Sequence, residues 1–284
     1  MRIAIAANPQ KPRALELARR AIDRVGGAAE IVGSPETAEA LGGLVPSHEL
    51  ASLDADLVLS LGGDGTFLWT LQRTDLPILA VHAGTVGFLA EVDGERPEEF
   101  DRAIDRVVAG DYAIEERLKL AVQIGPRSLP DATNEVVVHS SQVAKMRQYE
   151  LAVDGRPVGR VRADGLILAT PTGSTSYALS ALGPIVDPGI EAIVIAALAP
   201  FQVAHRTVLI DPRRAVTLRV VAPEKDAIVV VDGQEEYPLA PGEVLRVYRS
   251  PRRASFVRFG PGFFERLRGK GILPWREADV PPVA

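Results

Sequence analysis

Apolar and polar positions along the first 115 residues predict strands that alternate with helices. Short apolar runs predict strands over 3–7, 29–32, 56–61 and 77–81. Apolar residues at helical spacing predict helices over 12–25 and 97–109, each followed by glycine, with a weaker helix after Ser34-Pro35 and another over 66–73. Strands separated by helices imply a parallel sheet with helices on both faces, which binds ligands beyond the carboxyl ends of its strands.

From about residue 116 the pattern changes to short segments rich in branched residues, separated by turn pairs such as Asp154-Gly155 and Asp232-Gly233. These segments predict strands over 118–124, 135–138, 149–153, 166–169, 192–198, 216–221, 228–231 and 244–248. We therefore expect a Rossmann-like α/β domain over 1–115 and a β-rich, sandwich-like domain over 116–260. The tail, 261–284, has a helical pattern over 263–270 and is expected to pack back on the first domain.

Composition narrows the function classes. Apolar residues make up 46% of the 284 residues and charged residues 24%, which suits a globular protein with a sizeable core. The net charge of −5 argues against a nucleic-acid partner. The absence of cysteine excludes disulfides, thiol nucleophiles and iron–sulfur clusters. No apolar run suits a secretory signal or approaches the ~20 residues of a membrane span, so we expect a cytoplasmic location and no membrane partner.

Several familiar catalytic signatures are missing. The sequence contains no P-loop, no G-x-G-x-x-G opening a helix and no G-x-S-x-G nucleophile elbow. The four histidines are scattered without H-x-x-x-H pairing, so we interpret them as surface or packing residues rather than zinc ligands.

The run Gly62-Gly63-Asp64-Gly65-Thr66 follows a predicted buried strand. Its glycines let the chain turn sharply and bring backbone N–H groups close to an anion. A carboxylate in that position would repel phosphate, so we expect Asp64 to act on a hydroxyl group or a metal while its neighbours hold phosphate. The alternative is that Asp64 merely caps the helix over 66–73.

Three further stretches carry candidate chemistry. The glycines of 81–89 predict either a second loop beside the Asp64 loop or a plain turn. Thr133-Asn134-Glu135 offers donors and acceptors to a ligand, although alone it is more typical of an Asx turn. The block 162–180 is the strongest, because it holds more hydroxyl groups than helix capping needs: Thr170, Thr172, Ser174, Thr175, Ser176 and Ser180.

Together, Gly62–Thr66, Asn134-Glu135 and the block 162–180 resemble the NAD kinase family. The short glycine motif also occurs in lipid kinases and, in similar form, in phosphofructokinases, whereas Asp-Gly-Leu-Ile followed by Thr-Pro-Thr-Gly-Ser-Thr is more specific. The resemblance covers nearly the whole chain, including Gly84-x-x-Gly87-Phe88-Leu89, Gly183-Pro184-Ile185, Arg206 and Asp232-Gly233-Gln234. It implies phosphorylation of the adenosine-ribose 2′-hydroxyl of NAD to give NADP.

The resemblance also implies residue roles. Asp64 would be the general base, and Gly62, Gly63, Gly65 and Thr66 would form the phosphate loop. The implied NAD-contact positions are Asp64, Gly65, Asn134, Glu135, Lys145, Arg162, Asp164, Thr175, Ser176, Tyr177, Ala178, Leu179, Ser180, Ala199 and Gln234. Some of them are expected to reach across from a neighbouring subunit, because the family's β domains build homodimers and homotetramers.

ATP or another phosphoryl donor would be the second substrate, with a divalent ion such as Mg²⁺ whose protein ligands the sequence does not identify. Two alternatives remain open. A lipid or sphingoid-base kinase would share the glycine loop, but the hydroxyl block disfavours it. A non-catalytic NAD(H) or NADP(H) sensor is disfavoured by Asp64, because a pure binder gains nothing from an anion beside phosphates.

Overall fold

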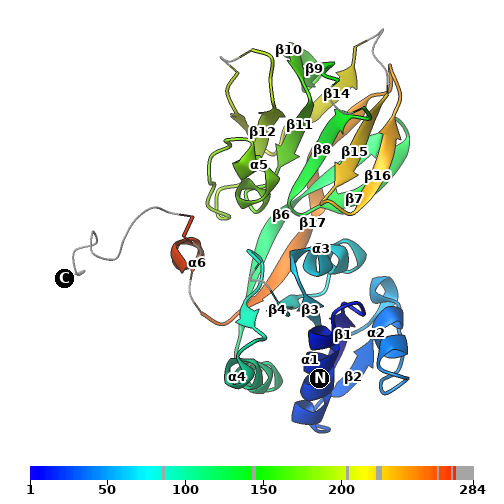
Figure 1. Cartoon of the computed structure of the whole chain (residues 1–284), viewed down its shortest axis with the longest axis vertical. Helices are drawn as coiled ribbons and strands as arrows, with labels where there is room; N and C mark the ends of the chain where they lie inside the picture. The colour runs from blue at the N-terminus through cyan, green and yellow to red at the C-terminus, as the bar shows by residue number, and fades with distance from the viewer. Residues whose placement is uncertain are drawn as a thin grey trace, which may run out of the picture.

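The computed structural model describes residues 1–84, 87–142, 145–202, 205–221, 226–260, 262–269 and 271–272. Two lobes lie one above the other along the long axis of the molecule (Figure 1). The lobe coloured blue to cyan combines helices with a small sheet, and the green to yellow lobe consists mostly of strands. This arrangement confirms the expected fold class.

The first lobe is built on parallel strands. Four neighbours pair in the order β2 (Glu30–Gly33), β1 (Arg2–Ala7), β3 (Leu57–Gly62) and β4 (Ile78–His82). The short β5 (Val92–Asp93) adds to β4, also in parallel. β1, β3 and β4 are almost entirely buried, as expected for strands covered on both faces.

Helices cover both faces of this parallel sheet. On one face, α1 (Pro12–Val25) and α4 (Pro97–Val108) share a core with the buried side chains of β1, β3 and β4 that point to that face. On the other face, α3 (Asp64–Arg73) and the 3-10 turn η1 (Leu50–Ser52) pack on alternate residues of the same strands. The short α2 (Pro35–Ala40) follows β2 and contacts β1 and β2. The sequence prediction gave α1 its observed bounds, because Gly26 ends the helix in the left-handed region at φ 53°.

The second lobe is an antiparallel sandwich. One sheet contains six strands, in the order β13 (Val208–Ile210), β12 (Ile193–Leu198), β11 (Gly165–Ala169), β8 (Glu135–Ser140), β15 (Ala227–Val231) and β16 (Glu235–Leu239). The facing strands are β10 (Arg156–Ala163), β9 (Arg147–Val153), β14 (Val216–Val220), β17 (Leu245–Arg258), β6 (Ala113–Ile124) and β7 (Arg127–Ala132). One core of alternate apolar side chains fills the space between them. Two short helical turns, η2 (Gly173–Thr175) and α5 (Tyr177–Ser180), follow β11.

Two long strands connect the lobes. β17 pairs antiparallel with β6 along its length, with an irregularity between Arg249 and Arg253, and meets β4 in parallel at Phe256. The sheet of the first lobe therefore continues into the second. The sequence prediction ended this strand at Tyr248, and it placed the domain boundary at 115/116, which falls inside β6.

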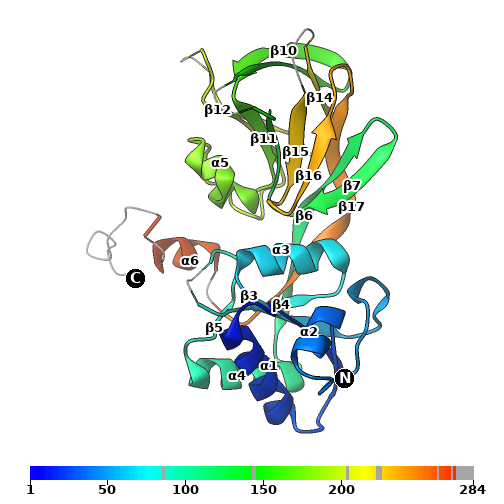
Figure 2. The same cartoon turned by 45° about the vertical axis from the view of Figure 1, so that its right-hand side comes forward.

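The tail helix α6 (Phe263–Gly269) lies beside the first lobe (Figure 2). Leu267 is fully buried, and Arg266 Nη1 lies 3.7 Å from Glu91 Oε2, just before β5. In the described part of the chain, no helix combines the length and apolar character needed to cross a membrane.

Candidate functional site

Helix α3 begins where the buried strand β3 ends, and glycines make this tight connection. A β-carbon added at Gly62 would fall 2.3 Å from Thr66 Oγ1. The Gly63 carbonyl accepts hydrogen bonds from the amides of Thr66 (2.9 Å) and Phe67 (3.2 Å). By helical geometry, the N–H groups of Asp64 and Gly65 have no partner within the helix and suit an anion.

The Asp64 carboxylate is held by the loop that follows β4. Its Oδ2 accepts a hydrogen bond from the amide of Phe88 (2.6 Å), and its Oδ1 accepts one from the amide of Leu89 (3.2 Å). A β-carbon added at Gly87 would fall 2.0 Å from Oδ1, so only glycine allows this approach. The second glycine loop thus lies beside the Asp64 loop, although Thr85 and Val86 fall outside the described residues. The capping alternative is wrong, because α3 starts at Asp64 and has Gly63, without a side-chain bond, at its N-cap.

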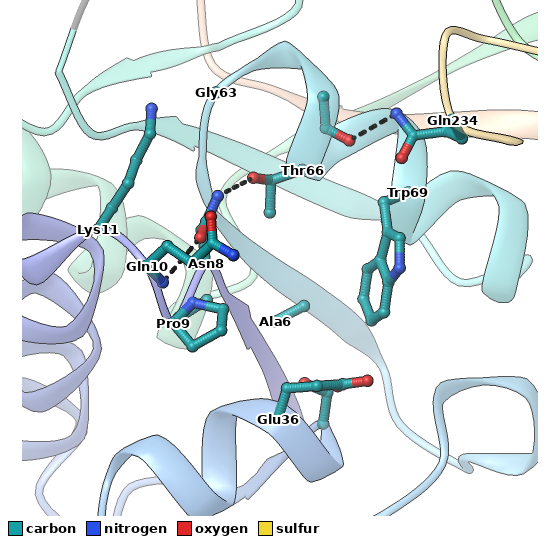
Figure 3. Close-up of a pocket in the computed structure, with 13 residues that line it drawn as sticks. Ala6, Asn8, Pro9, Gln10, Lys11, Glu36, Gly63, Thr66, Trp69 and Gln234 are labelled. Atoms are coloured by element: carbon teal, nitrogen blue, oxygen red, sulfur yellow. Dashed lines mark hydrogen bonds between the residues drawn. The ribbon is translucent and has the colours of Figure 1, made fainter.

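A cavity of ≈ 520 Å³ opens beside this turn (Figure 3). It is lined by the end of β1 and the loop after it, the start of α2, the first turns of α3 and one residue of the second lobe: Ala6, Ala7, Asn8, Pro9, Gln10, Lys11, Ser34, Glu36, Gly63, Gly65, Thr66, Trp69 and Gln234. Asn8 Nδ2 donates to Thr66 Oγ1 (3.4 Å). Lys11 Nζ donates to the Ala83 carbonyl (3.3 Å) and lies 3.4 Å from the β-carbon position of Gly63. A cation therefore stands beside the amide-rich turn.

Asp232 organises a second group of candidate residues. Its carboxylate is almost fully buried and accepts hydrogen bonds from three consecutive amides, those of Thr133 (2.8 Å), Asn134 (2.7 Å) and Glu135 (3.1 Å). The carbonyl of Asn134 in turn accepts the amide of Thr170 (2.8 Å). Burial raises the pKa of Asp232 to about 6, although the three amides act in the opposite direction.

Glu135 is the most perturbed acid in the site. Burial, followed by the nearby charge of Asp232, raises its pKa to about 8. Ser176 Oγ donates to its Oε1 (3.3 Å). Glu135 Oε2 and Asn134 Oδ1 are buried oxygens with no hydrogen-bond partner among the described residues. Buried polar atoms normally have partners, so both oxygens suit hydroxyl groups of a ligand, which can donate and accept.

Gln234 connects the two groups. It follows β15, in the same turn as Asp232, and its Nε2 donates to the carbonyl of Gly65 in the first turn of α3 (3.3 Å). The predicted positions Asp64, Gly65, Asn134, Glu135, Ser176 and Gln234 are thus brought to the junction of the lobes.

The hydroxyl block serves local structure more than the sequence suggested. Thr170 and Ser174 are buried and bond to backbone carbonyls of Thr133 and Pro171, and Thr175 Oγ1 bonds to the Thr172 carbonyl. Gly173 packs against the backbone of Asn134, where a β-carbon would fall 2.1 Å from its carbonyl oxygen. These contacts fix the Asn134 segment. Of the remaining predicted positions in this block, Tyr177 and Ser180 are exposed, Leu179 is half-buried and Ala178 is buried.

Four predicted NAD-contact positions lie elsewhere. Arg162, Asp164 and Ala199 gather at the start of β11, where the Arg162 guanidinium stacks on Phe201 at 5.0 Å and the Asp164 amide bonds to the Leu198 carbonyl. Lys145 is exposed just before β9, which pairs with β10. Glu135 pairs with Ala169 at the opposite end of β11. Four residue steps of strand separate the two ends of β11 by about 13 Å, so these four positions lie apart from the Asp64 junction.

Sequence reasoning missed Asn8, Lys11 and Trp69, and it took Asp232 only as part of a turn and of the family resemblance. The first two follow the carboxyl end of β1, and the rule that ligands bind beyond strand ends, applied to that strand as well, would have found them. Asp232 has no local signal, because its partners lie about a hundred residues earlier in the chain. Within the described ranges, no group of three His, Cys, Asp or Glu residues is placed to hold a metal ion.

Comparison with known proteins gives consistent matches. The family model described as the ATP-NAD kinase N-terminal domain matches residues 45–112, and that of the ATP-NAD kinase C-terminal domain matches residues 133–259. A protein named NAD kinase from Thermoplasma volcanium is 34% identical over 272 residues, which cover 96% of this chain and 98% of that protein. One of the same name from Thermococcus kodakarensis is 40% identical over 277 residues, covering 95% and 98%.

Solved structures agree with the sequence matches. A crystal structure of an NAD kinase from Archaeoglobus fulgidus in complex with ATP superposes with a TM-score of 0.77 at 29% identity, covering 95% of this chain and 98% of that one.

Proposed function

The chain belongs to the NAD kinase family of phosphotransferases, and we propose that it phosphorylates the adenosine-ribose 2′-hydroxyl of NAD with Asp64 as general base. One observation carries the assignment of the base. The Asp64 carboxylate is held by the amides of Phe88 and Leu89 at the very turn whose own free N–H groups suit phosphate. A proton acceptor and a phosphate cradle are therefore adjacent.

The proposed reaction is an in-line phosphoryl transfer. The 2′-oxygen forms a bond to the terminal phosphorus of the donor, while the bond from that phosphorus to the bridging oxygen breaks and the nucleoside diphosphate leaves. The proton of the hydroxyl group passes to Asp64. A carboxylate has lone pairs beyond those that Phe88 and Leu89 use, so Asp64 accepts this proton without leaving its loop. Fixing the reacting groups is the main task of such an enzyme.

We propose that NAD binds against the Asn134 segment. The two buried oxygens without partners, Asn134 Oδ1 and Glu135 Oε2, fit ribose hydroxyls, with Oε2 as donor while Glu135 is protonated and as acceptor once it is ionised. Ser176, whose hydroxyl bonds to Glu135, and Gln234, which reaches Gly65, would complete the contact. We further assign Thr175, Tyr177, Ala178, Leu179 and Ser180 to this side, because they continue the same turn.

A metal centre built by protein side chains does not fit the described residues, because no three metal-binding side chains gather there. We therefore propose that Mg²⁺ arrives as part of the metal–ATP substrate, bound by phosphate oxygens.

The predicted NAD-contact positions near the start of β11 lead us to propose that the protein is an oligomer. Lys145, Arg162, Asp164 and Ala199 lie near the start of β11, about 13 Å along the strand from the end that pairs with Glu135. We propose that they contact NAD held by a second copy. The edge strand β13 exposes about half of Val208 and Leu209 (49% and 48%), which suits antiparallel pairing across a twofold axis. The expected result is a dimer or tetramer by light scattering, and a Val208→Lys variant should shift it towards monomer.

Two sequence predictions stay predictions. We propose that residues 1–115 hold the phosphoryl donor and residues 116–260 hold NAD, with 261–284 returning to the first domain. A cytoplasmic location also remains an expectation from the sequence.

The direct test is an assay of NADP formation from NAD, ATP and Mg²⁺ with the purified full chain. We expect the rate of NADP formation to rise in proportion to the enzyme concentration. No product over a range of donors and metal ions would refute the proposal. Product formation on a lipid or sphingoid base instead of NAD would favour the alternative kinase, and tight NADP binding without turnover would favour a sensor.

A further inference from the structure

The segment that holds Asp64 with its amides is itself held by the end of β17. The amide of Leu89 donates to Asp64 Oδ1 (3.2 Å), and the carbonyl of the same residue accepts a long hydrogen bond from Arg258 Nη1 (3.5 Å). Two residues later, the Glu91 side chain is only 4% exposed, and it accepts from Arg258 Nη1 (2.9 Å) and from the amide of Phe259 (2.8 Å). The segment from Leu89 to Glu91 is therefore anchored to β17 at both of its ends.

Arg258 makes several contacts with one planar group. Its Nε donates to Glu115 Oε2 on β6 (2.7 Å), while its Nη1 donates to Glu91. Its guanidinium carbon lies 4.9 Å from the ring centre of Phe256. β17, drawn in orange, runs beside β6 from the second lobe to the first (Figure 1). A lysine at this position would supply a positive charge but neither the fork of N–H donors nor the flat face, so the site is specific for arginine.

Further cations surround the same two carboxylates. Arg117 Nη2 lies 3.0 Å from Glu115 Oε2, and Arg266 Nη1 on α6 lies 3.7 Å from Glu91 Oε2. Burial acts to raise the pKa of Glu115, but Arg117 and Arg258 outweigh it and lower the pKa to about 2. Glu115 is thus ionised at neutral pH, and it fixes one side of the Arg258 guanidinium in place.

This anchor bears on the reaction because the segment before it cannot support itself. Gly87 has to stay without a side chain beside Asp64 Oδ1, so it offers no packing of its own. The amides of Phe88 and Leu89 follow directly and hold the carboxylate. A general base must lie within hydrogen-bond reach of the proton it accepts, and a small displacement of it costs a large factor in rate.

Resting on the proposed function, we propose that Arg258 is a positioning residue for the phosphoryl transfer. It holds the segment from Phe88 to Glu91 so that the two amides keep Asp64 in place. Arg258 touches neither substrate in this proposal and acts on kcat through the base. Glu91 is its partner on the loop.

The first test separates kcat from KM. We expect Arg258→Met to lower kcat at least about tenfold, with the KM for NAD and for ATP within about twofold of the parent. Arg258→Lys, which keeps the charge, should lose about threefold in kcat. Arg253→Met is the matched control, because Arg253 lies on the same strand and also pairs with a glutamate, Glu191 (2.6 Å). This control should keep the parental kcat.

A milder variant keeps the test valid if Arg258→Met does not fold. Glu91→Gln retains the shape of the side chain and removes its charge, so it weakens the contact with Arg258 while Arg117 and Glu115 stay as they are. We expect about a threefold loss in kcat with unchanged KM values. Denaturant titration shows which variants are folded under the conditions of the assay. Parental kcat in folded Arg258→Lys and Glu91→Gln would overturn the inference.

A double-mutant cycle with Asp64→Asn separates positioning of the base from a general loss of structure. In that background the base is already gone, so Arg258→Met or Glu91→Gln should lower the residual rate by less than about twofold. An equal loss in both backgrounds, or a rise in KM alone, would overturn the inference and leave the NAD kinase activity in place. A parental rate in Asp64→Asn would instead refute the assignment of the base, and absence of NADP with the parent would refute the proposed function.

Discussion

Gln234 Nε2 donates a hydrogen bond to the carbonyl of Gly65 across 3.3 Å, so the β15–β16 turn of the second lobe touches the first turn of α3. The same turn of the second lobe carries Asp232, which holds the Asn134 segment. The proposed base and the proposed NAD-binding segment are therefore linked through three residues, Asp232 to Gln234.

Removing this link should affect catalysis more than stability. Gln234 is only partly buried, so Gln234→Ala is expected to change the melting temperature little, while kcat/KM for NAD falls about fivefold through lost alignment. Steady-state kinetics and a thermal melt measure the two effects. Gln142→Ala, at an exposed glutamine in the second lobe, is the matched control, and an equal loss in both variants would contradict the positioning role.

Asp64→Asn should lower kcat by at least about a hundredfold, because the amide keeps the shape of the carboxylate and loses its basicity. Binding of NAD, measured by calorimetry, should change much less. Circular dichroism should confirm an intact fold. A variant that turned over at the parental rate would show that another group takes the proton.

Gly87→Ala tests how the base is held. The new β-carbon would fall 2.0 Å from Asp64 Oδ1, so the carboxylate or the loop must move. We expect a fall in kcat of more than about tenfold and a loss of about 1–3 kcal/mol in the free energy of unfolding, measured by denaturant titration. Gly260→Ala has open space around its β-carbon and should match the parent; similar defects in both variants would remove the special role of Gly87.

Asp232→Asn should weaken NAD binding at a distance. The amide nitrogen of the new side chain would face backbone N–H groups that now donate to a carboxylate, which costs about 2 kcal/mol of stability. Because Asn134 and Glu135 lose their support, the KM for NAD should rise while the KM for ATP stays constant. Asp226→Asn, at an exposed aspartate, serves as the control. A change in kcat alone would argue against this role.

The pH dependence of stability follows from the raised pKa values of Glu135 and Asp232. Both groups hold protons in the folded state that they lose when unfolded, so the free energy of unfolding should fall as the pH rises. For Glu135 the window runs from its usual value of 4.5 to about 8, and for Asp232 from 3.8 to about 6. Glu115, whose pKa is lowered to about 2 with Arg117 and Arg258 as partners, contributes the opposite slope only below about pH 4.5.

Denaturant titrations at pH 5 to 8 would measure this slope. Glu135→Gln should flatten it, because the amide imitates the protonated acid and does not titrate. A slope that persisted unchanged in Glu135→Gln would exclude Glu135 as its source.

The sequence predicted the first lobe well because its signals are local. Buried strands, a proline that starts α1 and Gly26 that ends it all act within a few residues. β17 was only partly predicted, since the polar and proline-containing stretch after Tyr248 interrupts the apolar pattern where the strand crosses between lobes. The Asp64 turn was found from its glycines. The roles of Asp232 and Trp69 were not, because their positions depend on partners that only the folded chain brings near.

The long pair β6 and β17 limits how the two lobes can move. A peptide linker would let them swing apart freely, but here any rotation must bend a hydrogen-bonded ribbon and its shared sheet. The paired strands therefore make the connection between the lobes stiffer than a single-chain hinge would be. We therefore expect the two lobes to keep nearly the same orientation when substrates bind, and side chains and loops to make the small adjustments.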